Sequence, residues 1–116
     1  MEAGFATPSE ESFSKTLSLD DYLIENKQAS FLLRVKGTSM IEAGICERDL
    51  VIVERGREAR PGDIVIAEID GGWTMKYYRT GSRGPYLEAA SSEYPLIYPE
   101  GELKIVAVVR AVVRKY

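Results

Sequence analysis

Short runs of β-branched and apolar residues, separated by turn-forming residues, constrain the fold of this chain most strongly. Pro61-Gly62 and Asp70-Gly71-Gly72 are typical of turns, and the Asp-Gly pair favours a tight hairpin. We therefore expect strands over residues 31–35, 49–54, 63–69, 73–79, 86–89 and 103–113, the last being a central or bent strand. With one or two short helices, this pattern predicts a mostly β fold, a single domain of curled antiparallel sheets.

The first 18 residues differ from the rest of the chain. They combine Gly4, Pro8 and several serines with only two aromatic side chains, Phe5 and Phe13. This composition predicts a flexible arm over residues 1–18. Ser18 then offers a helix start, and Leu19 to Glu25 is expected to form a short helix whose apolar face docks on the core. The length of 116 residues suits one domain, which we place at residues 19–116.

Charge, cysteine content and hydrophobicity exclude several classes of protein. Eighteen acidic residues against fifteen basic ones give a net charge of -3, which argues against direct DNA binding. The single cysteine, Cys46, cannot form an internal disulfide, in keeping with a reducing cytoplasm. No apolar run approaches about 18 residues and no basic-then-apolar leader opens the chain. We expect a cytoplasmic protein without a membrane span or secretory signal.

A turn at Gly37-Thr38-Ser39 precedes an apolar run in a chain that contains no histidine. If Ser39 is a nucleophile, its proton must pass to a lysine, a carboxylate or the N-terminal amine. Lys76 lies within an aromatic and apolar segment, residues 73–78, where an ammonium group would be poorly solvated. Strand alternation places Thr74, Lys76 and Tyr78 on one face. Lys76 is therefore the candidate base.

Ser39 is also expected to cap a short helix that continues through Met40 and Ile41. The backbone amides of Ser39 and Met40 could then hold the oxyanion that forms during acyl transfer. The alternative is that the hydroxyl serves only as a cap, because Gly-Thr-Ser turns are common. Neither Asp20-Asp21 nor any other carboxylate pair has the spacing of a metal site, so we expect neither metal nor cofactor.

Together these pieces resemble the Ser/Lys self-cleaving domain shared by LexA, the phage repressors and UmuD. The resemblance spans nearly the whole chain and joins the serine, the lysine, their separation and the intervening strands. The matching residues are Gly37 to Met40 with Ile41 to Gly44, then 49–53, 62–67, 74–76, 87–92 with 94–96, and the valine-rich last strand.

The resemblance implies a LexA C-terminal domain-like fold and assigns the chemistry. It makes Ser39 the catalytic nucleophile, neutral Lys76 the base, and Ala3-Gly4 the scissile bond. Within the family the chain looks most like UmuD. UmuD-type proteins are homodimers of the SOS response that cleave themselves on meeting a RecA filament on single-stranded DNA. The trimmed dimer then serves a Y-family translesion polymerase as an accessory subunit.

Two other functions are compatible with the same residues. The chain could be the C-terminal dimerisation and self-cleavage domain of a LexA-like or phage transcriptional repressor. It could also be a non-catalytic binding module that keeps the fold, with Ser39 and Lys76 only stabilising it.

Overall fold

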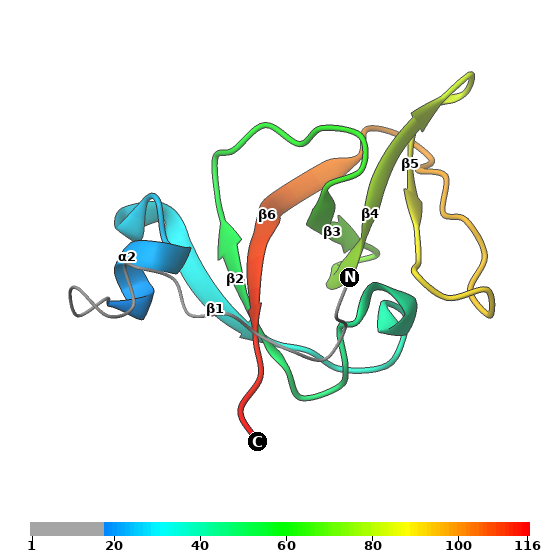
Figure 1. Ribbon diagram of the computed structural model, residues 1–116. Helices are drawn as coiled ribbons and strands as arrows, with labels where there is room; N and C mark the ends of the chain where they lie inside the picture. Colours follow the sequence, from blue (N-terminus) through cyan, green and yellow to red (C-terminus); the bar gives the residue numbers. More distant parts are fainter. Residues whose placement is uncertain (1–17) are drawn as a thin grey trace, which may run out of the picture.

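The structure, a computed structural model, describes residues 18–116. One antiparallel sheet of six strands organises this part of the chain, in the order β1-β2-β6-β3-β4-β5 (Figure 1). The expected strands and the mostly β, single-domain fold are confirmed. The strands are β1 (Ser30–Arg34), β2 (Leu50–Glu54), β3 (Ile64–Ile69), β4 (Gly72–Gly81), β5 (Gly84–Glu88) and β6 (Lys104–Val113).

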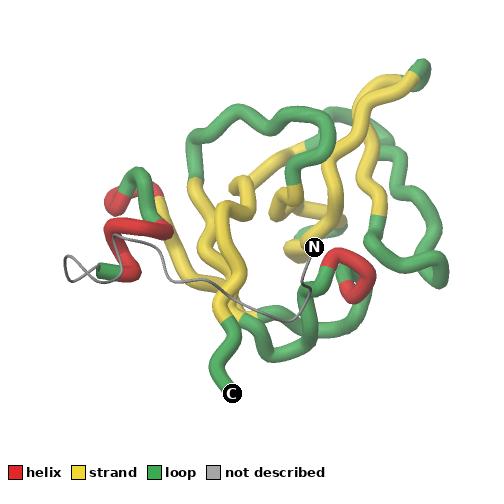
Figure 2. Tube along the Cα trace, viewed as in Figure 1, coloured by secondary structure: helices red, strands yellow, loops and turns green. Residues whose placement is uncertain are grey.

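The last strand, β6, is both central and bent, as its length and composition predict. It pairs with β2 on one side and β3 on the other. The register skips Arg110 between the pairs Ile52–Ala111 and Val53–Val109, and it skips Val106 where β6 meets β3. Each skip is a β-bulge, which bends a strand and increases its twist. The sheet is accordingly curled (Figure 2).

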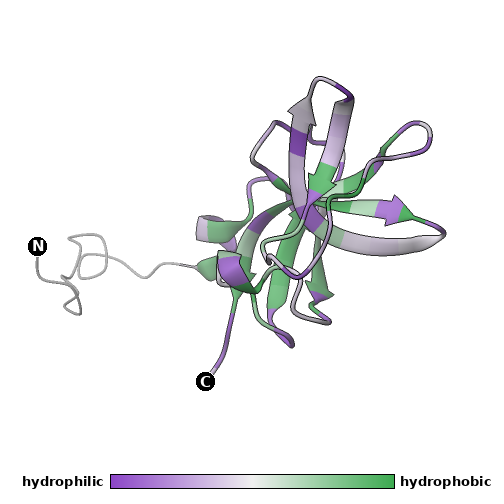
Figure 3. Ribbon diagram, turned by 90° about the vertical axis from the view of Figure 1, so that its right-hand side faces the viewer, coloured by the Kyte–Doolittle hydropathy of each residue, from purple (hydrophilic) through white to green (hydrophobic). Residues whose placement is uncertain are grey.

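Two clusters of buried side chains pack on the opposite faces of the sheet. Adjacent residues of one strand alternate between them: Ile66 belongs to the first cluster and Val65 to the second. Hydrophobic residues accordingly follow the central strands, while the connecting loops are mostly hydrophilic (Figure 3). The first cluster contains Val35, Met40, Ile45, Val51, Val53, Ile66, Ala90 and Ala107. The second contains Val65, Ala67, Leu87 and Val108.

The expected first helix forms as α2 (Leu19–Leu23), beside the start of β1 (Figure 1). The expectation that its apolar face docks on the core is wrong. No residue of α2 is buried, and Leu19 and Tyr22 are 71% and 78% exposed. Five residues make little more than one helical turn, which is too short to present a continuous apolar stripe. Two short 3-10 helices follow, η1 (Lys27–Ala29) and η2 (Ile41–Ala43).

Candidate active site

Lys76 lies in the middle of β4, opposite Val65 of β3, and only 7% of its surface is exposed. Its Nζ atom lies 3.1 Å from the Ser39 hydroxyl and 2.6 Å from the Thr74 hydroxyl. Within residues 18–116, Lys76 forms no ion pair with a carboxylate. Burial therefore lowers the pKa of its amine, because a desolvated ammonium is disfavoured and no opposite charge offsets the loss.

The turn that carries Ser39 is fixed at both ends. On one side, the Val35 amide donates to the Asp49 carbonyl over 2.9 Å. Gly37 then adopts a positive φ of 80°, a conformation suited to glycine, and the chain changes direction. On the other side, the Met40 side chain is 1% exposed, and its sulfur accepts a hydrogen bond from the Ala90 amide. Ser39 is therefore held between a strand end and a core side chain.

The expectation that Ser39 caps a helix is wrong. The helical turn here is η2, a three-residue 3-10 helix that begins at Ile41 and has Met40 at its N-cap without a side-chain capping bond. The Ser39 hydroxyl instead accepts a hydrogen bond from the Lys76 amine. In the described part of the chain, the amides of Ser39 and Met40 donate no hydrogen bond, so neither amide is used by the local fold.

Thr74 also belongs to the site, although no role was predicted for it. Its hydroxyl lies 2.6 Å from Lys76 Nζ, closer than that of Ser39. A neutral amine has two N–H donors and one lone pair. If one N–H points to Thr74, the lone pair can face the Ser39 hydroxyl. The available signal was the strand alternation, since residues two apart share a face.

Ser39 and Thr74 both line a cavity of about 270 Å³. Its other walls are mostly apolar and come from β1, β2, β3 and β4, with the polar turn after β1 at one side. The lining residues are Leu33, Arg34, Val35, Lys36, Gly37, Ser39, Met40, Val51, Ile66, Trp73, Thr74 and Met75. A small peptide segment could thus reach the serine beside an apolar wall.

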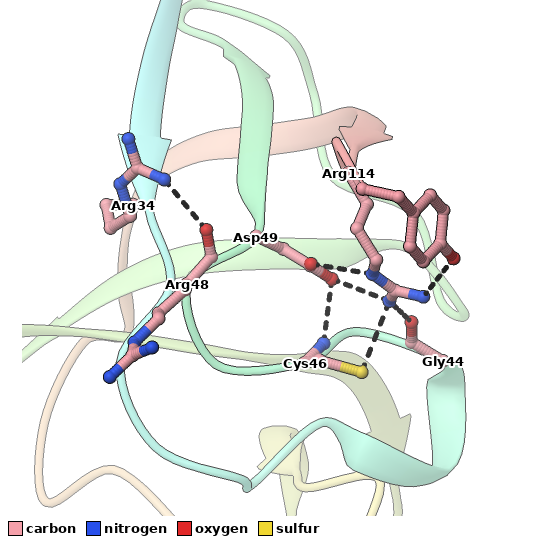
Figure 4. A network of polar contacts seen from close by, with 7 residues as sticks. Arg34, Gly44, Cys46, Arg48, Asp49 and Arg114 are labelled. Carbon is pink, nitrogen blue, oxygen red and sulfur yellow. Dashed lines mark hydrogen bonds and ion pairs between the residues drawn. The ribbon is translucent and has the colours of Figure 1, made fainter.

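A second polar cluster, which we call the Asp49–Arg114 clamp, consists of Gly44, Cys46, Asp49 and Arg114 (Figure 4). Both Asp49 oxygens accept hydrogen bonds from Arg114 at 2.8 Å, and one also accepts the Cys46 amide. Arg114 also donates to the Gly44 carbonyl and the Cys46 sulfur. The bonds from Arg114, then that from Cys46, lower the pKa of Asp49 to about 2.

Two pairs of candidate residues remain. Ala3 and Gly4 lie outside the described residues. Asp20 and Asp21 are exposed in the first turn of α2, and no group of three or more metal-ligating side chains occurs within residues 18–116. No helix in this range is long and apolar enough to cross a membrane.

Comparison with known proteins places these features in context. A family model described as Peptidase S24-like matches residues 1–110. Protein ImpA of Salmonella typhimurium is 40% identical over 116 residues, covering 98% of this chain and 79% of ImpA. Protein SamA of Salmonella typhimurium strain LT2 is 39% identical over 113 residues, covering 97% of this chain and 79% of SamA. The LexA repressor of Verrucomicrobium spinosum is 37% identical over 116 residues, covering 98% of this chain and 57% of the repressor.

Proposed function

This chain belongs to the Peptidase S24-like family, and from that premise we propose that it is a Ser/Lys serine endopeptidase that cleaves itself between Ala3 and Gly4. One observation carries the proposal. The amine of a buried lysine without a carboxylate partner among residues 18–116 lies 3.1 Å from the hydroxyl of Ser39. Such an amine loses its proton more easily than an exposed lysine, and it is within reach of the proton that it must take.

The first half of the reaction forms an ester. Neutral Lys76 takes the Ser39 hydroxyl proton while Oγ attacks the carbonyl carbon of Ala3. The backbone amides of Ser39 and Met40 hold the resulting oxyanion. The Lys76 ammonium then gives its proton to the Gly4 nitrogen, and the C–N bond breaks. The products of this step are an acyl ester of Ala3 on Ser39 and a chain that begins at Gly4.

The second half of the reaction restores the serine. Lys76, neutral again, takes a proton from a water molecule, whose oxygen attacks the ester carbonyl. The intermediate collapses, the proton passes to Ser39 Oγ, and a short peptide ending at Ala3 leaves. Thr74 holds one N–H of the amine throughout, which keeps the nitrogen lone pair directed toward the reacting hydroxyl.

The biological role that we propose is that of a UmuD-type protein. Residues 1–18 are a cleavable arm and residues 19–116 the peptidase domain. The cytoplasmic homodimer cleaves itself on meeting a RecA filament on single-stranded DNA, and the trimmed dimer assists a Y-family translesion polymerase. Similarity to the UmuD-like proteins ImpA and SamA supports this role.

Similarity to the LexA repressor favours a second candidate function. In that case the chain is the dimerisation and self-cleavage domain of a transcriptional repressor, and the same cut separates it from a DNA-binding domain. A genomic reading frame that extends upstream through a helix-turn-helix would distinguish this function from the UmuD-type role.

Intact mass measured between about pH 7 and pH 10.5, a range that leads up to ordinary lysine titration, tests the peptidase directly. The full chain should lose the segment ending at Ala3, faster at higher pH because more Lys76 is neutral. Ser39→Ala and Lys76→Ala should each slow cleavage by more than about a thousandfold. Lys104→Ala, which removes a lysine that is 69% exposed, should cleave normally.

The same experiment separates the peptidase from a binding module. A chain that stays intact at every pH, with and without RecA filament, would refute self-cleavage and favour the non-catalytic alternative. Circular dichroism of the two site variants would show whether loss of cleavage reflects loss of folding.

A further inference from the structure

A groove of about 310 Å³ lies next to the candidate active site. Its walls come from β1, β2 and β6 and from Trp73 at the start of β4. Three large apolar side chains of this groove are strongly exposed: Phe31 at 45%, Leu32 at 60% and Trp73 at 60%. Gathered apolar side chains at the surface commonly mark a place where another segment binds.

The groove and the active-site cavity are neighbours that share two lining residues. Leu33 and Trp73 line both, while Ser39 and Thr74 line the cavity alone. A peptide whose scissile bond lies at Ser39 therefore enters the groove as soon as it passes Trp73. An extended residue advances by about 3.3 Å, so a side chain two positions beyond the bond lies only about 7 Å from it.

The geometry points to residues 5–11 of this chain as the occupant, with the ring of Phe5 seated against Trp73 and Leu33. This inference rests on the proposed function, since it places Phe5 directly after the scissile Ala3-Gly4 bond. The groove thus serves as a specificity site for an aromatic side chain on the leaving side of the cut. Its volume is near the lower end of ligand pockets, about 300 to 1,000 Å³.

The direction in which the chain must run supports this occupant. Residues 1–17 join the described chain just before α2, which lies beside β1, on the other side of that strand from β4 (Figure 1). The groove spans from β1 to Trp73 and so lies between α2 and Ser39. Fourteen extended residues, 5–18, reach about 46 Å, which is more than two of the three principal dimensions of the molecule, 35 and 27 Å.

Charge supports the same occupant. Residues 1–17 contain three acidic side chains, Glu2, Glu10 and Glu11, and one lysine. Arg55 lines the groove, with its guanidinium 5.7 Å from the centre of the Phe31 ring, and it has no carboxylate partner within residues 18–116. An acidic segment that follows an aromatic anchor therefore matches an apolar groove with an arginine at its side.

The single tryptophan makes the groove observable by fluorescence. In the uncleavable Ser39→Ala full chain, docking of Phe5 should shield Trp73 and shift its emission to shorter wavelength. Adding Phe5→Ala should shift the emission back to longer wavelength, whereas Phe13→Ala should leave it unchanged. In the cleavable chain, Phe5→Ala should slow self-cleavage about tenfold, equivalent to about 1.4 kcal/mol, and Phe13→Ala should not.

A double-mutant cycle locates the contact. Trp73→Ala removes an exposed groove side chain against which Phe5 is seated and should slow cleavage, but it should add little to the effect of Phe5→Ala if the two side chains meet. Equal emission and equal cleavage rates for the Phe5→Ala and Phe13→Ala chains would overturn the inference. Trp73 emission that is unchanged by Phe5→Ala but changes on dilution would also overturn the inference, because a second copy of the chain would then cover the groove.

The two proposals fail separately. If the unaltered chain never cleaves but Trp73 emission still depends on Phe5, the docking groove stands and the peptidase does not. If cleavage proceeds and depends on Ser39 and Lys76 but not on Phe5, the peptidase stands and the groove has no role in choosing the substrate.

Discussion

The candidate active site and the Asp49–Arg114 clamp hold their charged side chains in opposite ways. Lys76 and Asp49 are almost equally buried, at 7% and 4% exposed. The partners of Lys76 are two hydroxyl groups, so burial lowers the pKa of the amine. Asp49 instead faces a guanidinium on both oxygens, which holds the pKa of the carboxyl at about 2.

This difference shows how one small domain can bury one group whose ionised form is favoured and another whose neutral form is favoured. A buried charge with an opposite charge beside it stays ionised and serves to position the chain. A buried amine that has only hydroxyl partners can become neutral, and a neutral amine is a base. The partner, rather than the degree of burial, decides which chemistry is possible.

The two clusters are also joined through the chain. The clamp fixes the segment from Gly44 to Asp49, and Asp49 in turn accepts the Val35 amide through its carbonyl. Arg48 donates its amide to the Val35 carbonyl, so both backbone groups of Val35 are held. The turn with Ser39 starts directly after this point. The Asp49–Arg114 clamp therefore positions one end of the candidate active site.

Giving Lys76 a carboxylate partner should have the largest effect. In Thr74→Asp, the added negative charge beside the amine should raise the pKa of Lys76, because an opposite charge favours the ammonium. Less neutral amine is then present near neutral pH. We expect self-cleavage at pH 7.5 to slow by about tenfold or more and to recover at higher pH, as measured by intact mass across the pH range.

Thr74→Asn is the matched control, because it keeps the size of the aspartate and a hydrogen-bonding oxygen without the charge. Cleavage of Thr74→Asn should therefore depend on pH in the same way as cleavage of the unaltered chain. Thr80→Val, on an exposed threonine of the same strand, should change nothing. A Thr74→Asp chain whose pH profile matches that of Thr74→Asn would contradict the electrostatic interpretation.

Breaking the clamp should have the next largest effect. Arg114→Met leaves Asp49 buried without its cation, and a buried unpaired charge is strongly unfavourable. We expect a clear fall in the melting temperature at pH 7, measured by circular dichroism. Arg110→Met, which removes the same charge from an exposed pair with Glu25, should change the melting temperature little.

The pKa of Asp49 determines how the difference in melting temperature between the unaltered chain and Arg114→Met depends on pH. The folded pKa, about 2, is below the ordinary value of 3.8, so the contribution of Asp49 is present above pH 3.8 and is lost as the pH falls toward 2. The gap in melting temperature between the unaltered chain and Arg114→Met should therefore narrow over this range. A gap that stays constant would show that Asp49 is not its source.

The strands were predictable because their signals are local. Asp70-Gly71 fixed the β3–β4 hairpin, and the alternation along β4 placed Thr74 and Lys76 on one face. The bulges at Arg110 and Val106 had no such signal, because they depend on how β6 fits between two neighbours. Strand order in this sheet was likewise a matter of long-range packing.

The site was only partly predictable for the same reason. Burial of Lys76 was expected from its aromatic and apolar neighbours, but its approach to Ser39 across 37 positions came from the family resemblance. The expectation that the Ser39 hydroxyl also caps a helix was wrong, because the helical turn begins at Ile41 with Met40 as its N-cap. Asp49 and Arg114 are 65 positions apart in the sequence, and no local sequence pattern predicts their contact.

Replacing the reactive amine with an apolar side chain should have the smallest effect and the opposite sign to breaking the clamp. Lys76→Met keeps a similar length and removes a polar group that is costly to bury, so the free energy of unfolding should rise by about 1 kcal/mol at pH 7 while cleavage is lost. Lys104→Met, at an exposed lysine, should leave stability unchanged. Urea unfolding of the unaltered chain, Lys76→Met and Lys104→Met measures the free energy of unfolding, and intact mass measures cleavage. A Lys76→Met chain less stable than the unaltered one would mean that the site stabilises the fold, and the contrast with the clamp would disappear.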